Sequence, residues 1–381
     1  MAQLFVYRNC FSGDISGGDM HTGGFCKWVH EQHPEIALSL VHPAGDGQEK
    51  FYAETASLDN ITYQDTTAGN LIAKWLLRAR LGAKISLPLA DEPTLLVAGS
   101  HLIADVWPVY KQGARRKNVK RMVYIHHVVQ DMPRAKGFNT LAANWHEKIC
   151  FWLIKRRYDK IITVNEEVVA SLRKRGFKQD ILVSSNFVND NTSAPKAYVD
   201  KDIDLTFCGR FVEQKGIFDF LAVCEKLQTN NPNFRAAMMG VGPRLDDVRE
   251  QVATKHLSIE VLGRVEEAQK FDMHARSKLF VFPSIEEGWG IVVAEALSSG
   301  TPVLAYDLPV YRDIFGTHMH VVPLKDTAAL VESAAQLLHG YRKNPADYVQ
   351  EQQAIVTFAK AFQRGTVIQK EFDFVMEPAY E

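Results

Sequence analysis

The sequence has few cysteines and no long apolar run. Its five cysteines are odd in number, widely spaced and without a CxxC pair, which argues against both a disulfide framework and a zinc site. We therefore expect free, buried thiols. No uncharged stretch approaches the length that crosses a bilayer, and the start, MAQLFVYRNCF, lacks the basic segment and apolar core of a signal peptide. These absences predict a cytoplasmic protein.

The chain also lacks an excess of charge of either sign. Its formal net charge is −1 and its pI is about 6.9, unlike that of a protein that binds phosphate backbones, so we expect no nucleic-acid partner. A hydrophobic content of 46% and a charged content of 23% are typical of a globular protein. Its 381 residues are more than one core usually serves, which favours two domains.

Short apolar, β-branched runs alternate with longer segments of helical period, the pattern of parallel sheets covered by helices. Residues 186–202, rich in Asn, Asp, Ser and Pro, interrupt this pattern as an interdomain linker does. We predict a first domain over residues 1–189, a second over 190–355, and a helical segment over 356–381 that packs back on the first. The expected strands are 3–7, 94–98, 121–125, 160–164, 204–209, 234–240, 258–263, 278–283 and 301–306.

Basic residues concentrate in the first half of the chain. Residues 1–190 carry 24 Lys and Arg against 19 Asp and Glu, whereas the remainder carries 20 against 26. Six basic residues and no acid occur in KQGARRKNVKR (residues 111–121), and more follow in IKRR (154–157). Either these charges form a solvated face beside a strand, or they meet an anionic membrane surface or an anionic acceptor.

The stretch CGRFVEQKGIFDFLAVCEKL (residues 208–227) carries two candidate ligand-binding cations. A strand is expected to end at Gly209 and a helix to begin near Gly216. Arg210 and Lys215 would then lie at the carboxyl end of a strand and the amino end of a helix, where open α/β sheets bind anions. We interpret them as a diphosphate clamp; the alternative is a pair of exposed surface charges.

The stretch FPSIEEGWGIVVAEALSSG (residues 282–300) reads as a strand end, a loop and a helix with a glycine C-cap. Gly288 and Gly290 permit close backbone approach, and the N–H groups of the helix's first turn, from Gly290 to Val292, are free to bind an anion. Glu287 lies before this turn and Glu295 after it. Two carboxylates on either side of a phosphate site suit a nucleoside diphosphate sugar, although a pair of glutamates eight residues apart can also be coincidence.

Several motifs together resemble retaining glycosyltransferase family 4. They are GRFVEQKG (209–216), MGVGP (239–243), VLGRV (261–265) and EGWGIVVAEALSSGTPVLAYD (287–307), in the order and spacing of that family. The resemblance implies a GT-B fold, in which two Rossmann-like domains face each other across a cleft. It also implies site roles: Gly209, Arg210 and Lys215 at the donor diphosphate, Glu287 at the transferred sugar, Glu295 at the ribose, Arg264 and Val265 near the base, and Gly288, Trp289, Gly290 and Ile291 along the donor.

The first half resembles the family more weakly. SGGDMH (residues 16–21) follows the first strand and is similar to the family's glycine-rich loop, where Gly17 and Gly18 would let the backbone approach the donor phosphate; it could also be an ordinary turn. RMVYIHHVVQD (121–131) puts two histidines directly after a strand. His126 aligns best with the family's histidine near the sugar hydroxyls, but His127 could be the functional one, and a histidine can also simply cap a strand.

These motifs predict a retaining glycosyltransferase that uses a nucleotide-sugar donor, UDP- or GDP-linked, and a glycan or lipid-linked acceptor. The alternatives are a sugar-nucleotide epimerase of the same fold and a non-catalytic nucleotide-sugar-binding subunit. DID (residues 202–204) matches the metal-binding DxD motif of a different fold, but it stands at the end of the linker. We interpret its carboxylates as solvated, and expect neither a metal nor another cofactor.

Two segments of the first half interleave aromatic and aliphatic residues with Lys and Arg. They are NLIAKWLLRARLGAK (residues 70–84) and WHEKICFWLIKRR (145–157). An interfacial helix needs this composition, so we expect the first domain to dock peripherally on an anionic membrane surface. The alternative is that the apolar positions pack on the sheet.

Overall fold

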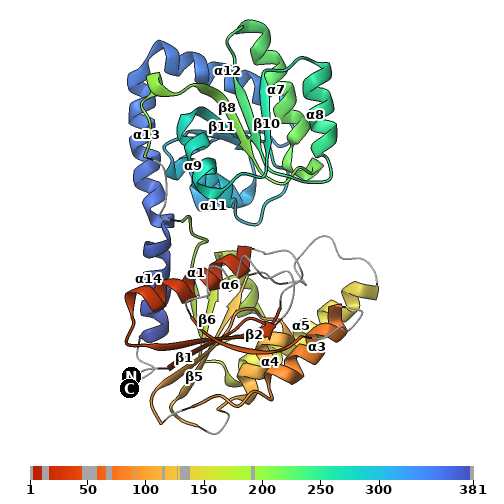
Figure 1. Cartoon of the computed structure of the whole chain (residues 1–381), viewed down its shortest axis with the longest axis vertical. Coiled ribbons are helices and arrows are strands. Elements are labelled where there is room, and N and C mark those ends of the chain that lie inside the picture. Colours follow the sequence, from red (N-terminus) through yellow and green to blue (C-terminus); the bar gives the residue numbers. More distant parts are fainter. Residues whose placement is uncertain are drawn as a thin grey trace. The chain divides into compact units, whose positions relative to one another are not determined.

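The computed structural model (Figure 1) describes residues 3–10, 17–44, 58–65, 71–89, 91–113, 116–126, 128, 138–189 and 194–377. It divides into two compact units, one of Met1–Asn186 with Arg364–Glu381 and the other of Phe187–Gln363. The boundary lies after Asn186 instead of after residue 189, and the chain re-enters the first unit at Arg364 instead of at residue 356.

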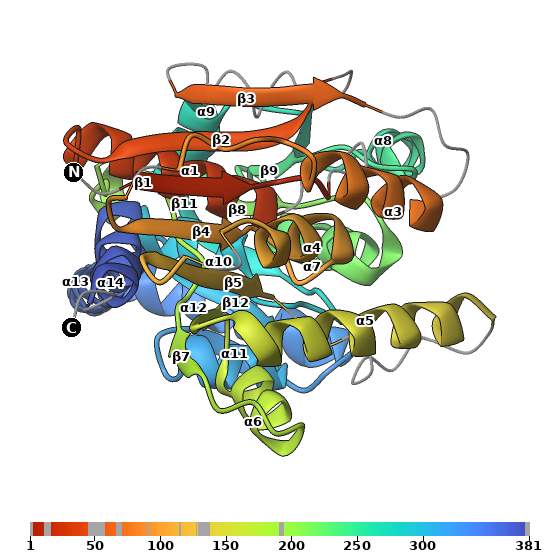
Figure 2. The same ribbon diagram turned by 90° about the horizontal axis from the view of Figure 1, so that it is seen from below.

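The first unit is built on a parallel sheet with the strand order β3-β2-β1-β4-β5-β6-β7 among the described residues, much of which can be followed in Figure 2. Its elements are β1 (Gln3–Tyr7), α1 (Gly17–Gln32), β2 (Ala37–Ala44), β3 (Asp59–Gln64), α3 (Leu71–Gly82), β4 (Thr94–Ala98), α4 (Ile103–Lys111), β5 (Val119–Ile125), α5 (Phe138–Arg157), β6 (Lys160–Thr163), α6 (Glu166–Lys174), β7 (Asp180–Val183) and α14 (Arg364–Met376).

The second unit has a parallel sheet of order β10-β9-β8-β11-β12-β13 in the part of the chain that is described. Its elements are β8 (Ile203–Cys208), α7 (Ile217–Asn230), β9 (Ala236–Met239), α8 (Leu245–Thr254), β10 (Ile259–Gly263), α9 (Glu267–Arg276), β11 (Ser277–Phe282), α10 (Ile291–Ser298), β12 (Val303–Tyr306), α11 (Pro309–Phe315), β13 (His320–Val322), α12 (Thr327–Lys343) and α13 (Pro345–Ala359), with short 3₁₀ turns at Tyr198–Asp200, Glu213–Lys215 and Lys360–Phe362.

Both sheets are doubly wound, and the order of strands reverses direction once in each. In the first unit the reversal falls between β1 and β4, and in the second between β8 and β11. Parallel sheets of this kind bind ligands beyond the carboxyl ends of the strands at the point of reversal. The α/β class with two Rossmann-like domains is therefore confirmed, and the two reversal points are where a site is expected.

The central strands of the second unit are almost entirely buried, as expected for strands with helices on both faces. All six residues of β8 are buried, and Val281 and Phe282 of β11 are at most 1% exposed. Phe207 and Phe282 contact each other with ring centroids 5.7 Å apart. This apolar layer ends where β8 and β11 end, so the polar residues that follow lie on a rigid base.

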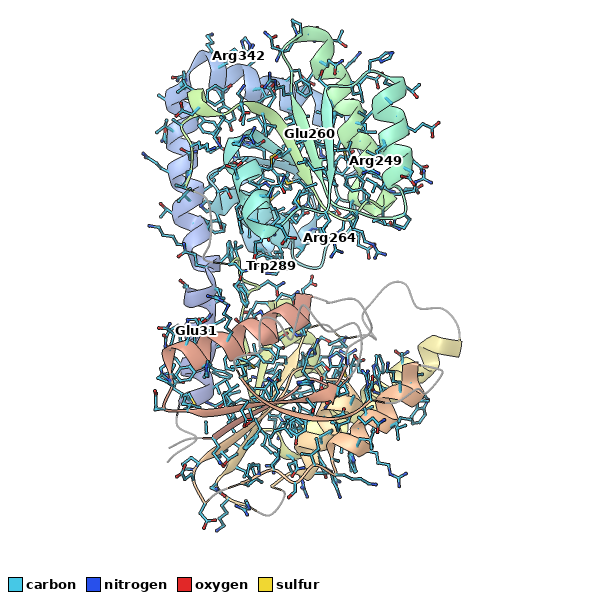
Figure 3. All side chains as sticks on the ribbon, in the orientation of Figure 1. Glu31, Arg249, Glu260, Arg264, Trp289 and Arg342 are labelled. Atoms are coloured by element: carbon cyan, nitrogen blue, oxygen red, sulfur yellow. The ribbon has the colours of Figure 1, made fainter. Side chains whose placement is uncertain are left out.

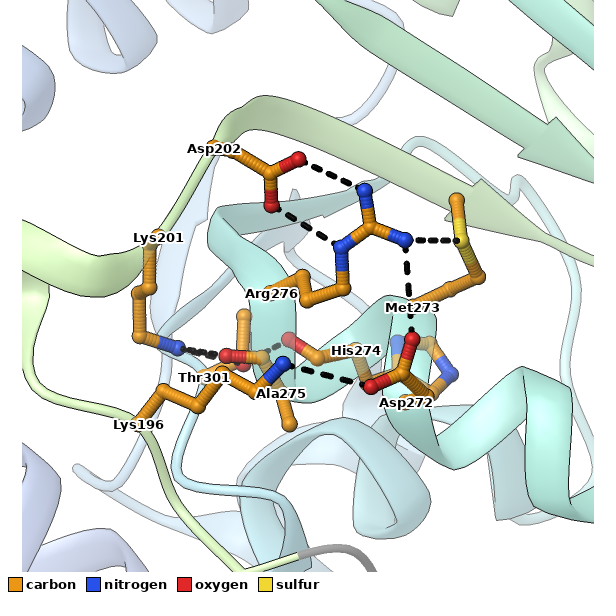
Figure 4. A network of polar contacts seen from close by, with 9 residues as sticks. All are labelled: Lys196, Lys201, Asp202, Asp272, Met273, His274, Ala275, Arg276 and Thr301. Carbon is orange, nitrogen blue, oxygen red and sulfur yellow. Dashed lines mark hydrogen bonds and ion pairs between the residues drawn. The ribbon is translucent and has the colours of Figure 1, made fainter.

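The start of β8 is fixed by a polar network around the buried Lys201 (Figure 4). The Lys201 ammonium donates to the carbonyl oxygens of Ala275 at 2.7 Å and Ser277 at 2.9 Å. Asp202 accepts both ends of the Arg276 guanidinium, at 2.9 and 2.6 Å. The network joins the strand to α9 and β11 at the end of the sheet opposite the reversal-point loops.

The prediction that the DID carboxylates are solvated is wrong for Asp204, whereas Asp202 is exposed. Asp202 is bound by Arg276, and Asp204 is buried in an ion pair with Lys278, whose Nζ lies 2.8 Å from Oδ1. Both carboxylates therefore serve the structure.

All five cysteines are buried and free, as predicted. Within the described residues, no helix is both long and apolar enough to span a membrane, and no cluster of three or more His, Cys, Asp or Glu side chains is arranged to hold a metal ion.

Helix α14 belongs to the first unit because it buries a carboxylate there. Glu371 is fully buried, with Oε1 2.7 Å from Nε2 of His21 on α1. The hydroxyl of Tyr124 on β5 donates to the other carboxylate oxygen at 2.8 Å. Phe372 stacks on the His33 ring with centroids 4.0 Å apart. A polar contact and an aromatic contact thus fix this helix against the first unit's own elements.

Candidate active site

The two loops at the reversal point of the second unit are joined to each other. After β11, Ile285 donates its backbone N–H to the carbonyl of Gln214 at 2.9 Å, and the Ser284 hydroxyl donates to the same carbonyl at 3.2 Å. Gly216 has φ +68°, and a Cβ there would stand 2.0 Å from the carbonyl oxygen of Pro283. Only glycine permits this approach, so the residue holds the loops after β8 and β11 in contact.

Lys215 and Glu287 meet across these two loops. The Lys215 ammonium forms an ion pair with Oε1 of Glu287, and both side chains are largely buried. The ammonium also lies 5.7 Å from the centre of the Phe282 ring. Two residues predicted to bind different parts of a donor therefore neutralise each other in this structure, and each can be released to a ligand of opposite charge or to a hydroxyl group.

Arg210 directly follows the loop's first residue, Gly209, after β8. Its side chain is exposed and has no hydrogen bond or ion pair to the residues that the structure describes. The flanking backbone is nevertheless fixed, because Gly209 donates to the carbonyl of Met239 at 3.0 Å and Phe211 donates to that of Val241 at 2.9 Å. An uncommitted guanidinium on a fixed backbone suits an anionic ligand.

The first turn of α10 is shaped by two glycines. Gly290 caps the helix with φ +99°, and a Cβ there would lie 2.9 Å from the Tyr311 ring. At Gly288 a Cβ would have no neighbour within 4 Å, so the backbone faces open space. The N–H groups of Gly290 to Val292 precede the first intrahelical bonds. This turn, which includes Ile291, can therefore donate hydrogen bonds to an anion.

The indole of Trp289 packs inward. It is 4% exposed and lies edge-on to Phe315 at 5.5 Å and to Phe362 at 5.3 Å, measured between ring centroids. The side chain therefore supports the loop between the two glycines and is not available to a donor. Figure 3 shows Trp289 and Arg264 toward the same end of the second unit.

Glu295 is paired with a residue that the sequence did not single out. Its carboxylate is 5% exposed and accepts from Nζ of Lys270 on α9 at 2.5 Å. Its other oxygen, Oε2, is buried with no hydrogen-bond partner among the described residues. Burial raises the pKa of Glu295 above its ordinary value, and Lys270 offsets only part of this. The unpartnered oxygen is the atom that a ligand hydroxyl could satisfy.

Arg264 and Val265 follow the end of β10, where Gly240 donates to the carbonyl of Gly263 at 2.7 Å. Arg264 is exposed and Val265 is half-buried. No contact between either side chain and Glu287 or Glu295 is seen, so the structure places them at the same edge of the sheet without bringing them into the paired cluster.

The candidates in the first unit lie after β1 and β5. Gly17 and Gly18 begin α1, while residues 11–16 and His127 lie outside the described residues. His126 is half-buried and stacks on Tyr124, with centroids 5.9 Å apart and ring planes at 8°. Since Tyr124 also donates to Glu371, the histidine ring rests on a side chain whose hydroxyl is already fixed.

A buried polar cluster at the first unit's reversal point was missed from the sequence. Asp105 is fully buried and accepts from the backbone N–H of Asn9 at 2.5 Å and from the Ser100 hydroxyl at 2.6 Å. Its second oxygen lies 3.7 Å from a guanidinium nitrogen of Arg8. Burial raises the pKa of Asp105, while these partners lower it in part. The cluster ties the loop after β1 to the loop after β4. A lone Asp in a helical segment gives no sequence signal for it.

Residues 188–354 match the family model described as glycosyl transferases group 1. The second unit is a domain of this family. The matched range contains both loops of the reversal point and the two paired glutamates, Glu287 and Glu295.

The whole chain is similar in fold to solved glycosyltransferase structures. With Anabaena Alr3699/HepE in complex with UDP and glucose, the TM-score is 0.69 at 14% identity, over 98% of this chain and 99% of that one. With the glycosyltransferase from Rickettsia africae ESF-5, the TM-score is 0.71 at 17% identity, over 98% of each chain. At this identity the likeness shows the fold alone, which is GT-B.

Curated relatives match over shorter stretches. The putative teichuronic acid biosynthesis glycosyltransferase TuaC of Bacillus subtilis (strain 168) is 34% identical over 134 residues, which are 35% of this chain and 32% of that protein. The phosphatidyl-myo-inositol mannosyltransferase of Mycobacterium leprae (strain TN) is 28% identical over 213 residues, or 53% of each chain. The matches thus span about a third to about half of these relatives' lengths.

Proposed function

We propose that the protein is a retaining glycosyltransferase that moves a sugar from a nucleoside diphosphate sugar to a hydroxyl group of an acceptor. The observation that carries this proposal is the Lys215–Glu287 ion pair at the reversal point, beside the exposed Arg210 and the first turn of α10. Cations, free N–H groups and a carboxylate in one place match the parts of such a donor: a diphosphate and the sugar attached to it.

Arg210, Lys215 and the first turn of α10 bind the diphosphate in this proposal. When the donor enters, its phosphate oxygens replace Glu287 as the partner of the Lys215 ammonium. Charge grows on the diphosphate as the bond to the sugar breaks, and fixed donors aimed at growing charge usually make the largest contribution to catalysis. Two cations and a helix N-terminus supply this stabilisation, so the proposed reaction requires no metal ion and no other cofactor.

The two glutamates bind opposite ends of the donor. Glu287, released from Lys215, accepts a hydrogen bond from a hydroxyl group of the transferred sugar. Glu295 remains on Lys270 and uses its unpartnered Oε2 to accept from the ribose. Arg264 and Val265 lie toward the base, and the base is uracil or guanine in the proposal. Gly17 and Gly18 of the first unit are proposed to bind a donor phosphate through their backbone, and His126 to bind a hydroxyl group of the sugar.

Retention of configuration is proposed to follow from attack on the same face that the diphosphate leaves. The acceptor oxygen then forms its bond to the anomeric carbon as the bond to the phosphate oxygen breaks. The departing phosphate takes the proton of the acceptor hydroxyl, so no separate base is required. The acceptor is a glycan or a lipid-linked molecule; the names of the relatives from B. subtilis and M. leprae support this class.

The test measures sugar release and transfer from UDP- and GDP-linked sugars, with the wild-type protein and two pairs of variants. Arg210→Ala and Lys215→Ala should lower turnover greatly. Arg235→Ala, at the amino end of β9, and Lys226→Ala, on α7, are matched controls on exposed residues. Interconversion of sugar nucleotides without transfer would instead indicate an epimerase. Tight donor binding without any turnover would indicate a binding subunit.

A further inference from the structure

The large apolar side chains exposed on the described part of the first unit gather on two helices. They form what we call the α3/α5 apolar face, made up of Ile72 (39% exposed), Leu76 (55%), Leu77 (37%), Trp145 (67%), Ile149 (51%) and Trp152 (48%). In the described part of the second unit, the exposed large apolar residues are scattered over several elements and include no aromatic side chain: Val199, Val241, Val321, Leu324 and Val349.

The helical period places these residues on the outer side of each helix. Trp145, Ile149 and Trp152 are spaced i, i+4, i+7 along α5, whereas Cys150 and Ile154 of the same helix are fully buried. The alternative interpretation, that all apolar positions of these segments pack on the sheet, is therefore wrong for this face. The two helices are neighbours: α4 contacts both, as Figure 2 shows, and the Trp75 and His146 rings lie 5.7 Å apart.

The charges around the α3/α5 apolar face are positive. The Arg156 guanidinium lies 4.1 Å from the centre of the Trp152 ring, and Nζ of Lys148 lies 5.7 Å from that of Trp145. The sole acid in either helix, Glu147, is buried beside His101 and contributes nothing to the outer surface. The exposed tryptophan rings suit an apolar phase, and the cations that lie over them suit anionic groups.

The basic stretch over residues 111–121 is a poorer candidate than these helices. Arg121 is buried and donates to the carbonyl oxygens of Val109 at 3.2 Å and Gln112 at 2.8 Å. Lys120 lies 3.8 Å from a carboxylate oxygen of Asp159. Arg121 therefore cannot meet a membrane surface, whereas Arg116 and Lys117 of the same stretch are exposed.

We propose that the α3/α5 apolar face docks the first unit on an anionic membrane surface. The apolar side chains enter the boundary between headgroups and acyl chains, while Lys148 and Arg156 remain at the level of the lipid phosphates. A membrane fits better than a protein partner because the face combines aromatic residues with cations, and neither of the two helices carries an exposed acid. Docking itself does not depend on the proposed transfer reaction; the corollary, a lipid-linked acceptor, does rest on it.

Co-sedimentation with vesicles tests the docking. The full chain should pellet with vesicles of phosphatidylcholine and phosphatidylglycerol and remain in the supernatant with phosphatidylcholine alone. The triple variant Trp145→Gln, Ile149→Gln, Trp152→Gln should weaken binding by about tenfold or more, and Lys148→Gln with Arg156→Gln should weaken it and reduce its salt dependence. Val199→Gln with Val349→Gln, also exposed apolar positions but in the second unit, is the control and should bind as the wild type does.

Other outcomes would overturn the proposal. Wild-type protein that stays in the supernatant at low salt, or a triple variant that pellets normally, rules out docking through this face. A wild-type dimer that the triple variant converts to a monomer would assign the face to a second copy of the chain. Donor hydrolysis without acceptor is measured in parallel: docking without hydrolysis would contradict the proposed function alone, and hydrolysis without docking would contradict this inference alone.

Discussion

Lys215 and Glu287 form an ion pair between the loops that follow the neighbouring strands β8 and β11. The pair holds each side chain in place while no ligand is bound, and it leaves neither charge uncompensated in a largely buried position. A diphosphate that takes over the ammonium frees the carboxylate for a hydroxyl group. Binding of one part of the donor thereby prepares the contact for the other part.

This exchange predicts opposite effects of Glu287→Gln on binding and turnover. The variant removes a negative charge beside the diphosphate position, so a nucleoside diphosphate without sugar should bind as tightly as to the wild type or up to about tenfold more tightly. Turnover of the donor sugar should fall by about a hundredfold, because the carboxylate that contacts the sugar is gone. Isothermal titration and a transfer assay measure the two effects; weaker binding of the sugar-free nucleotide would contradict the exchange.

Loss of either cation should mainly affect turnover. Arg210→Ala and Lys215→Ala each remove one charge that stabilises the departing diphosphate, and we expect a loss of about a hundredfold or more in turnover. The far-ultraviolet circular dichroism of both variants should match that of the wild type. Near-normal turnover in both, or an equal loss in the Arg235→Ala and Lys226→Ala controls, would remove the diphosphate clamp from the mechanism.

Glu295 and Lys270 are expected to govern donor affinity. Glu295→Gln keeps the shape of the side chain but weakens its hydrogen bond to the ribose, so donor binding should fall by about tenfold with a smaller effect on turnover of bound donor. Lys270→Met leaves the Glu295 carboxyl buried without its cation, which favours its protonated form, and should also weaken binding. Glu250→Gln on α8, which is exposed, is the control for the first substitution. Unchanged affinity in Glu295→Gln would contradict the ribose role.

The acid sensitivity of the second unit should depend on His274. This side chain is fully buried with neither ring nitrogen hydrogen-bonded to a described residue, and burial, aided by the charges of Lys270 and Lys201, lowers its pKa to about 3. The pKa of a histidine in the unfolded chain is about 6.5, so between the two pKa values the unfolded chain binds a proton at this residue and the folded chain does not. The contribution of the neutral His274 to the free energy of unfolding is therefore fully present above pH 6.5. It is lost as the pH falls toward 3, and the loss is about 2 kcal/mol at pH 5.

Urea unfolding at pH 7 and pH 5 measures this loss. His274→Phe should show a smaller decrease in the free energy of unfolding between the two pH values than the wild type, whatever its stability at pH 7. His339→Phe, an exposed position on α12, should show the same decrease as the wild type. An unchanged decrease in His274→Phe would assign the acid sensitivity to other groups.

Glu371 should stabilise the first unit through its two partners. Glu371→Gln presents an amide group to donors that now meet a carboxylate, namely the Tyr124 hydroxyl and the His21 ring. Leaving a buried polar group without its partner costs roughly 1 to 3 kcal/mol, and we expect a decrease of that size in the free energy of unfolding. Asp373→Asn, exposed on the same helix, should cost less than this. Equal costs would show that the buried contact is not what fixes α14.

The positions of strands and site residues were predicted best where a strand ends in a loop that contains charged residues and glycines. The strands β8 and β11, and the cations and glutamates that follow them, were expected within a few residues of where they lie. The edge strands β3, β7 and β13, and β2 next to β3, were not predicted. In β2 a histidine and a proline disturb the apolar run, and β3 is a half-exposed strand with polar residues on both faces, so neither has the pattern of a buried strand.

The partners of the buried charged side chains could not be predicted from the sequence, for a physical reason. Lys270 precedes Glu295 by 25 residues on a different helix, and only the packing of α9 on α10 brings them to 2.5 Å. The Asp105 cluster likewise depends on the adjacency of β1 and β4, which are separated by two other strands in the chain. Spacing along one segment can indicate a site, but partners from separate segments become visible only when the sheet order is known.

The return of the chain to its first unit at Arg364 has a consequence for synthesis. Helix α14 leaves the ribosome only after the whole of residues 187–363, so the second unit can fold while the first still lacks an element. Until Glu371 arrives, the Tyr124 hydroxyl and the His21 ring have no carboxylate between them. The half of the protein that is translated first is therefore the half that is completed last.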